Sequence, residues 1–172
     1  MVLVLGASTM LFVGIVAEFV VLRGASEQWP PPGSPPLPQG FLFSTAVLLL
    51  SSLTLAVAHL CIRRDRTQAF VRFLSLTSLL GVVFLGSQIL CWTQLMREGF
   101  LPRTNVYGGN LYLITWTHAA HVVAALVILL TVNARALRGA YSLRSHLGVE
   151  IASMFWHFLD AVWVCMYLLL LS

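Results

Sequence analysis

Five apolar stretches run along the chain, and a polar segment separates each from the next. They extend from Val2 to Leu22, Leu42 to Ile62, Phe73 to Gln94, Leu111 to Val132 and Leu147 to Leu171. An α-helix rises about 1.5 Å per residue, so about 20 apolar residues cross the roughly 30 Å hydrocarbon core of a membrane. The stretches lack the apolar–polar alternation of membrane β-strands. The pattern predicts one all-α bundle over residues 1–172, a polytopic membrane protein with five transmembrane helices.

Composition strengthens this prediction. Hydrophobic residues make up 59% of the 172 residues and charged residues only 9%, whereas an average soluble domain carries about 25% charged residues. This excludes a soluble enzyme and a disordered tail. The net charge is +4 and all ten basic residues are arginines, but they form no basic stripe, so no nucleic-acid partner is expected. The first stretch lacks a basic leader and is too long for a signal peptide, so we expect it to remain as a span.

The arginines also predict the orientation of the helices. Two of the four loops carry most of them: Arg63, Arg64, Arg66 and Arg72 in one, and Arg135, Arg138 and Arg144 in the other. The loops on the opposite side hold only Arg23, Arg97 and Arg103. Because arginine-rich short loops stay in the cytoplasm, we expect a cytoplasmic N-terminus and a C-terminus outside.

The first loop holds six of the seven prolines, within residues 29–38. Proline fixes φ, so this segment is a stiff connector. It is either a spacer between two helices or a rigid strap against a partner subunit, with Trp29 as an interfacial anchor. The three cysteines lie in different spans without a CxxC motif, which favours packing over redox chemistry.

Several ionisable residues interrupt the apolar stretches, and such residues are costly in a membrane and functional by default. They are Glu18, His59, His118, His121, Glu150, His157 and Asp160. Glu18 is close enough to the outer end of its span to snorkel or to pair with Arg23.

The spacing of these residues suggests a shared polar stripe. His118 and His121 are three residues apart, and Glu150, His157 and Asp160 recur at intervals of seven and three, so each set shares a helix face. The fourth and fifth helices run antiparallel. We therefore expect them to face each other, with His118 level with Asp160 and His121 level with His157.

Four kinds of chemistry fit such a stripe. Histidines bind metals, and pairs of them hold b-type haems in helix bundles. A chain of histidine and carboxylate groups also relays protons. The fourth interpretation is structural: the groups hydrogen-bond between helices and fix their register, or contact lipid headgroups. The chain contains no glycine-rich phosphate loop, serine-nucleophile motif or HExxH motif, so nothing indicates a self-sufficient enzyme.

Four segments resemble the haem–copper oxidase subunit III family. Residues 146–163, with the run WHFLDAVW, are similar to the last helix of that family, and residues 112–122 are similar to its Thr-Gly-x-His-x-x-His-Val segment. Residues 48–54 and 79–88 are similar to bacterial members. The resemblance extends over essentially the whole chain, and five spans match the short form that lacks the first two helices of the seven-span form.

The chain departs from the family pattern at three places. Ser8 stands where a buried glutamate is usual in the first span, and Cys91 replaces a second glutamate. Trp116 and Thr117 occupy the place of the glycine before the first histidine of the fourth span. The chain is therefore a divergent member, and Ser8 marks the family-equivalent site of its first helix.

The resemblance implies a non-catalytic subunit in a bacterial inner membrane. Such a subunit has no cofactor of its own and docks beside a catalytic subunit that carries haem and copper, together with other oxidase subunits. It holds phospholipids in a cleft between its first two helices and the other three, and it supports proton uptake and durable turnover. Two alternatives remain open at this point: an accessory subunit of a nitric-oxide reductase, and a stand-alone b-type cytochrome.

Overall fold

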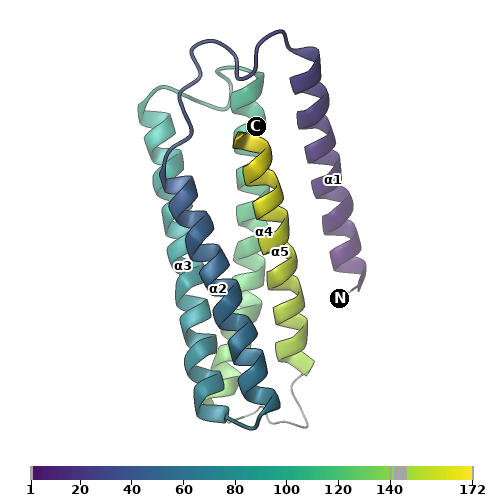
Figure 1. Ribbon diagram of the computed structural model, residues 1–172, viewed down its shortest axis with the longest axis vertical. Helices are drawn as coiled ribbons and strands as arrows, with labels where there is room; N and C mark the ends of the chain where they lie inside the picture. The colour runs from purple at the N-terminus through teal and green to yellow at the C-terminus, as the bar shows by residue number, and fades with distance from the viewer. Residues whose placement is uncertain (1, 140, 142–146, 172) are drawn as a thin grey trace.

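The computed structural model describes residues 2–139, 141 and 147–171. Its five helices are α1 (Val2–Ala25), α2 (Gly40–Arg63), α3 (Thr67–Arg97), α4 (Val106–Leu137) and α5 (Leu147–Leu171). All five are long and apolar enough to cross a membrane, and they run side by side along the long axis of the molecule (Figure 1). This confirms the predicted all-α protein with five membrane-spanning helices. Arg144, one of the loop arginines that predict the orientation, lies outside the described residues, as does position 146 at the start of the family-like segment.

Two of the helices are longer than their apolar stretches. α3 has 31 residues and α4 has 32, which corresponds to about 46 to 48 Å at 1.5 Å per residue. The extra turns of α3 and the last turn of α4 contain arginine, glutamine, alanine and leucine, which are good helix formers, whereas the first turn of α4 begins at the Asn105 cap. The apolar pattern ends where the hydrocarbon core ends, but the helical hydrogen bonding continues beyond it.

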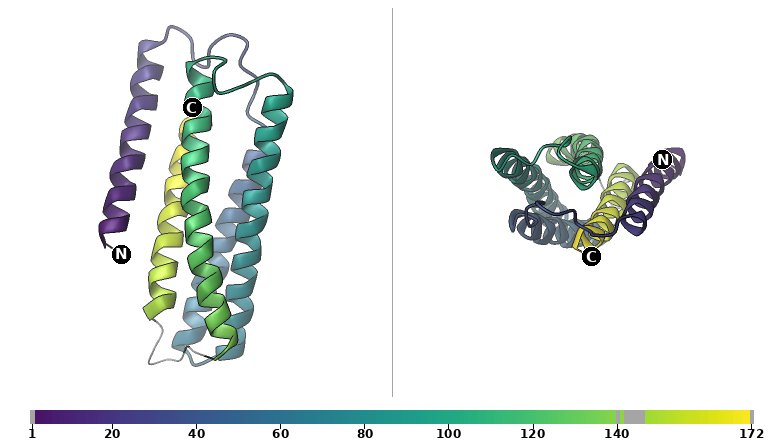
Figure 2. Two further views of the ribbon diagram at one scale, coloured as in Figure 1. Left: turned by 180° about the vertical axis from the view of Figure 1, so that it is seen from behind. Right: turned by 90° about the horizontal axis from the view of Figure 1, so that it is seen from above.

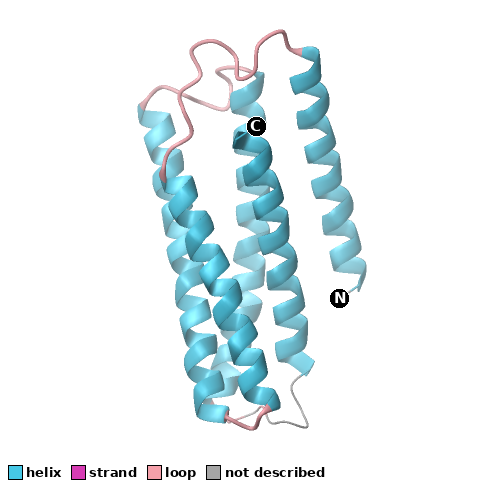
Figure 3. Cartoon of the chain, viewed as in Figure 1, coloured by secondary structure: helices cyan, strands magenta, loops and turns pink. Residues whose placement is uncertain are grey.

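Helices α2 to α5 form a four-helix bundle, and α1 stands at its side (Figure 2). α2 packs along α3, and the pairs α3–α4, α4–α5 and α2–α5 close the bundle. α1 packs more sparsely, against α5. The helices account for most of the described chain, and the loops that join them lie at the two ends (Figure 3).

The proline-rich loop is fixed to the bundle by an aromatic contact and a hydrogen bond. The Trp29 ring packs edge-on between Phe19 of α1 and Tyr107 of α4, with ring centroids 5.2 and 5.3 Å away. Asn105 caps α4 by accepting a hydrogen bond from the Gly108 amide at 2.7 Å, and its side-chain amide donates to Ser34 in the loop. The loop therefore positions α1 relative to α4, and Trp29 serves as an anchor within the chain.

Candidate functional site

Side-chain hydroxyls follow one another along α2 and mark the most polar seam of the bundle. The residues are Ser44, Thr45, Ser51, Ser52 and Thr54, and all except Ser52 are buried. The pairs Ser44/Thr45 and Ser51/Ser52 are seven residues apart, which is two helical turns, so they lie on one side of the helix. We call these five residues the hydroxyl seam.

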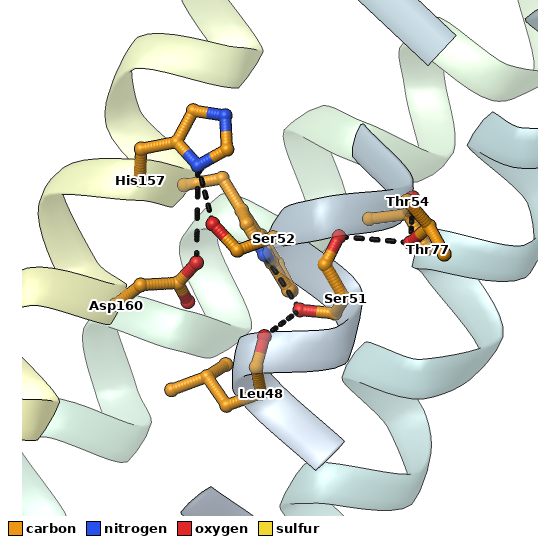
Figure 4. A network of polar contacts seen from close by, with 8 residues as sticks. Leu48, Ser51, Ser52, Thr54, Thr77, His157 and Asp160 are labelled. Carbon is orange, nitrogen blue, oxygen red and sulfur yellow. Dashed lines mark hydrogen bonds and ion pairs between the residues drawn. The ribbon is translucent and has the colours of Figure 1, made fainter. Parts of the chain in front are cut away.

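The fifth helix binds the hydroxyl seam through three consecutive contacts. The Trp156 indole N–H donates to Ser51 Oγ at 3.0 Å, and the Trp163 indole N–H donates to Thr45 Oγ1 at 2.9 Å. His157 Nδ1 hydrogen-bonds Ser52 Oγ at 2.5 Å (Figure 4). The residue numbers in the three pairs add to nearly the same total, as level contacts between antiparallel helices require. α5 is thereby held against α2 in one register.

The third helix binds the opposite side of the same seam. Gln88 Nε2 donates to Ser44 Oγ at 2.8 Å, and the hydroxyls of Thr54 and Thr77 lie 2.8 Å apart. Helix α2 therefore carries polar contacts to both neighbours at several depths. In a membrane each such bond contributes on average about 0.6 kcal/mol, and its directionality fixes helix register.

Asp160 lies next to the seam, on the same face of α5 as His157. Its carboxylate Oδ2 is 3.9 Å from His157 Nδ1, and Asp160 is only 5% exposed. His157 and Glu150 also line an open groove between α5 and α2, together with His59 and Ser153. Within the described residues, the polar side chains of α5 therefore face α2.

His118 lies at the centre of the molecule, inside an aromatic box. It is fully buried, and its ring centroid lies 4.9 Å from that of Trp163, 6.0 Å from Phe84 and 6.2 Å from Phe12. Neither ring nitrogen has a hydrogen-bond partner among the described residues. Aromatic rings thus contact His118 from three other helices, which favours a role in packing.

His121 is turned toward the first helix. Its Nδ1 lies 2.8 Å from the Thr117 carbonyl oxygen, and its ring centroid is 5.0 Å from that of Phe12. Among the described residues, no group of three or more histidine, cysteine, aspartate or glutamate side chains is arranged to hold a metal ion. Phe12 thus contacts both histidines of α4 and links α1 to the bundle.

These contacts correct part of the predicted polar stripe. α4 and α5 are neighbours, as expected, and His118 contacts Trp163, one turn from Asp160, so these residues lie at similar depth. His121 and His157 do not face each other, because His121 packs on α1 and His157 bonds α2; their expected equal depth stays a prediction. The polar groups of α4 and α5 are divided among three interfaces.

The expected cleft also lies elsewhere. The resemblance implied an opening between the first two helices and the other three, but α2 packs within the bundle against α3 and α5. An apolar groove of about 300 Å³ instead separates α1 from α5. Its walls are Thr9, Phe12, Val13, Val16 and Ala17 of α1 and Phe158, Val162, Cys165 and Met166 of α5.

Two further sequence predictions concern the first helix. Ser8, at the family-equivalent site, is buried on α1, and its role stays a prediction. Glu18 lines a second groove with Arg103 and Asn110, between α1 and the start of α4. The hydroxyl seam itself was missed, although the seven-residue recurrence of its paired hydroxyls was visible in the sequence.

The family model for cytochrome c oxidase subunit III matches residues 1–171. The chain belongs to the cytochrome c oxidase subunit III family. This membership supports a non-catalytic subunit of a terminal oxidase over a nitric-oxide reductase accessory subunit and over a stand-alone b-type cytochrome. It also fits a chain that binds no cofactor of its own, in complex with other oxidase subunits.

Individual members of the subunit III family agree with this assignment. Cytochrome c oxidase subunit 3 of Thermostichus vulcanus is 32% identical over 165 residues, which cover 95% of this chain and 81% of the relative. The protein of the same name from Synechocystis sp. is 31% identical over 170 residues, covering 98% and 72%. The subunit 3 of Petromyzon marinus is 34% identical over 142 residues, covering 81% of this chain and 53% of that longer protein.

Proposed function

We propose that this chain is the subunit III of a respiratory haem–copper oxidase in a bacterial inner membrane. It binds the catalytic subunit and other oxidase subunits, and it stabilises the complex and its proton uptake during turnover. Haem and copper belong to the catalytic partner. The excess of arginine in the loops after α2 and α4 supports a cytoplasmic N-terminus and an external C-terminus.

The main support for this proposal is that polar side chains within the spans contact neighbouring helices. His157 and both indoles bond the hydroxyl seam, and aromatic rings enclose His118, so these four side chains contribute to helix packing. The hydroxyl seam and its partners therefore fix the positions of α2, α3 and α5 relative to one another. A subunit of this kind stabilises the catalytic subunit through its packing and takes no part in the chemical reaction.

The first test of this proposal compares the active lifetime of the oxidase with its initial rate of oxygen reduction. In the assembled oxidase, we expect His157→Ala to leave the initial rate of oxygen reduction within about twofold of wild type and to shorten the active lifetime severalfold. The loss of one interhelical hydrogen bond, about 0.6 kcal/mol, loosens α5 without removing a reacting group. Oxygen consumption followed through prolonged turnover measures both quantities.

A matched control is Thr131→Ala, because among the described residues the Thr131 hydroxyl bonds only its own helix, at the Val127 carbonyl. This variant should keep the wild-type lifetime. An immediate and complete loss of turnover in fully assembled His157→Ala oxidase would show a relay or catalytic role and would refute the structural one.

We also propose that the groove between α1 and α5 holds a phospholipid acyl chain. Its lining is almost entirely apolar, and its volume of about 300 Å³ suits hydrocarbon. Because α1 otherwise packs sparsely on the bundle, a lipid in this groove adds contact area to both helices. The lipid would then stabilise the position of α1.

Filling this groove provides the test. We expect Val162→Trp to reduce the phospholipid retained by the purified complex by about one molecule per chain, as measured by quantitative phosphate and lipid mass analysis. Leu168→Trp is the control, since Leu168 is an exposed residue of the same helix that does not line the groove. Equal lipid content in both variants and wild type would exclude a bound lipid there.

A further inference from the structure

The turn between α2 and α3 gathers an excess of positive charge. Arg63, Arg64, Arg66 and Arg72 lie within ten residues, and Asp65 is the only acidic residue among them. All four arginines are exposed. In the part of the chain that the structure describes, no hydrogen bond or ion pair engages their guanidinium groups. This end of the bundle therefore carries guanidinium groups that no described side chain engages.

Two of these arginines line an open groove at the start of α3. The groove has a volume of about 650 Å³, and its walls are Asp65, Arg66, Thr67, Gln68, Ala69, Arg72 and Phe73. Guanidinium groups bind phosphate oxygens in pairs of parallel hydrogen bonds, so two of them beside one groove favour a phosphate-bearing ligand. Thr67 and Gln68 add neutral polar groups to the same wall.

The position of this groove along α3, relative to the membrane, indicates the source of such a ligand. The apolar stretch of α3 begins at Phe73, so residues 67–72 extend about 9 Å beyond the hydrocarbon boundary at 1.5 Å per residue. The headgroup layer on each side of a membrane is about 5 to 8 Å thick. Arg72 therefore lies at the inner edge of the headgroup layer and Thr67 just beyond its outer edge, so the groove that both line spans the depth of the lipid phosphates.

Below the groove, α3 presents an apolar path to the membrane. Leu76, Leu79 and Val83 follow Arg72 at intervals of four, three and four residues, so they share its face of the helix. All three are exposed. A molecule with a phosphate at Arg72 would therefore have its acyl chain along these side chains.

We propose that the groove at the α2–α3 turn binds the headgroup of an anionic phospholipid, with Arg66 and Arg72 on its phosphate and its acyl chain along Leu76, Leu79 and Val83. A net anionic lipid is favoured over a zwitterionic one because four arginines face a single carboxylate. This site lies at the opposite end of the bundle from the proline-rich loop (Figure 1), and it does not depend on the groove between α1 and α5.

Asp65 carries the one negative charge among residues 63–72 and lies in the turn beside these arginines. Its φ is +58°, a conformation that glycine adopts without steric cost. The turn closes through hydrogen bonds from the Arg66 amide to the Cys61 carbonyl and from the Asp65 amide to the Ile62 carbonyl. Asp65→Gly therefore removes the negative charge while keeping the turn.

The test reconstitutes the full chain into phosphatidylcholine bilayers and measures its association with spin-labelled phosphatidylglycerol or phosphatidylcholine. For wild type we expect about a threefold preference for phosphatidylglycerol. Arg66→Gln/Arg72→Gln should lose at least half of that preference, and Asp65→Gly should increase it. The control Arg97→Gln/Arg103→Gln removes two arginines at the opposite end of the bundle, one at the end of α3 and one in the loop before α4, and should keep the preference.

Three results would overturn the proposal. One is an unchanged preference in Arg66→Gln/Arg72→Gln, and another is an equal loss in the control. The third comes from a competition with inorganic phosphate against sodium chloride of the same ionic strength: abolition of the lipid preference by phosphate alone would assign the groove to a soluble phosphate. Equal, modest losses with both salts reflect charge screening and support the lipid.

Discussion

Replacing Trp163 with alanine is expected to lower the free energy of unfolding by about 3 to 5 kcal/mol, the usual cost of truncating a fully buried tryptophan. Trp163 is 0% exposed. Its ring packs edge-on against Phe84, with centroids 5.4 Å apart, and stacks near Phe41 at 6.2 Å. The variant loses contacts to three helices and leaves a cavity beside His118.

The measurement is unfolding of the purified chain in mixed micelles of increasing denaturing-detergent content, followed by circular dichroism. Two further variants separate the contribution of the Trp163 ring from that of its hydrogen bond. Trp163→Phe keeps an aromatic ring and should lose less than half as much stability. Thr45→Val removes the hydroxyl that accepts from the indole and donates to the Phe41 carbonyl of its own helix, and the loss of the interhelical bond should cost about 0.6 kcal/mol. A Trp163→Ala protein as stable as Thr45→Val would show that this ring does not hold the bundle together.

Replacing Gly81 with alanine should destabilise the bundle by about 1 to 3 kcal/mol, the cost of overpacking a tight interface. A Cβ at Gly81 would lie 2.6 Å from Trp156 Cη2 and 3.0 Å from Leu126 Cδ1. The absence of a side chain allows α3 to approach α4 and α5 closely. The Trp156 ring has little freedom to move away, because its N–H is bonded to Ser51.

Gly86 of the same helix is the matched control. A Cβ at Gly86 would meet nothing within 4 Å, so Gly86→Ala should be neutral or stabilise α3 by up to about 1 kcal/mol through helix propensity. The same unfolding measurement compares the two variants. Equal stabilities for Gly81→Ala and Gly86→Ala would contradict the close approach of the helices at Gly81.

The helices were predictable because each membrane span is a local property. About 20 apolar residues in a row require a helix in the hydrocarbon core, since all backbone polar groups must bond within the segment. The ends were less predictable: α3 begins at Thr67 and α4 at Val106, several residues before the apolar stretches. Polar residues end an apolar stretch without ending a helix.

The arrangement of the helices in the membrane plane was only partly predictable. The ionisable residues of α4 and α5 correctly placed these helices together. They did not reveal that His157 bonds Ser52 or that Phe12 packs on His121, because side-chain direction depends on how all five helices pack. The same limit explains the misplaced cleft: nothing in the apolar pattern shows that α2 joins α3 and α5 while α1 stands apart.

The hydroxyl seam illustrates a different limit. Serine and threonine within a span commonly bond their own helix, as Thr54 also does at the Ser51 carbonyl, so the pattern of hydroxyls alone does not identify partners. Two of the partners are the tryptophans of α5, which are seven residues apart. Matching two seven-residue recurrences on antiparallel helices would have found the seam.

The most direct test of the proposed non-catalytic role is the visible spectrum and metal content of the purified full chain, measured alone and with the subunits that copurify with it. We expect the chain alone to show no Soret band and no stoichiometric copper. The copurified complex should contain a large subunit that accounts for all of its haem and copper. A Soret band of one haem per chain from the isolated polypeptide would contradict this role and would identify a cytochrome.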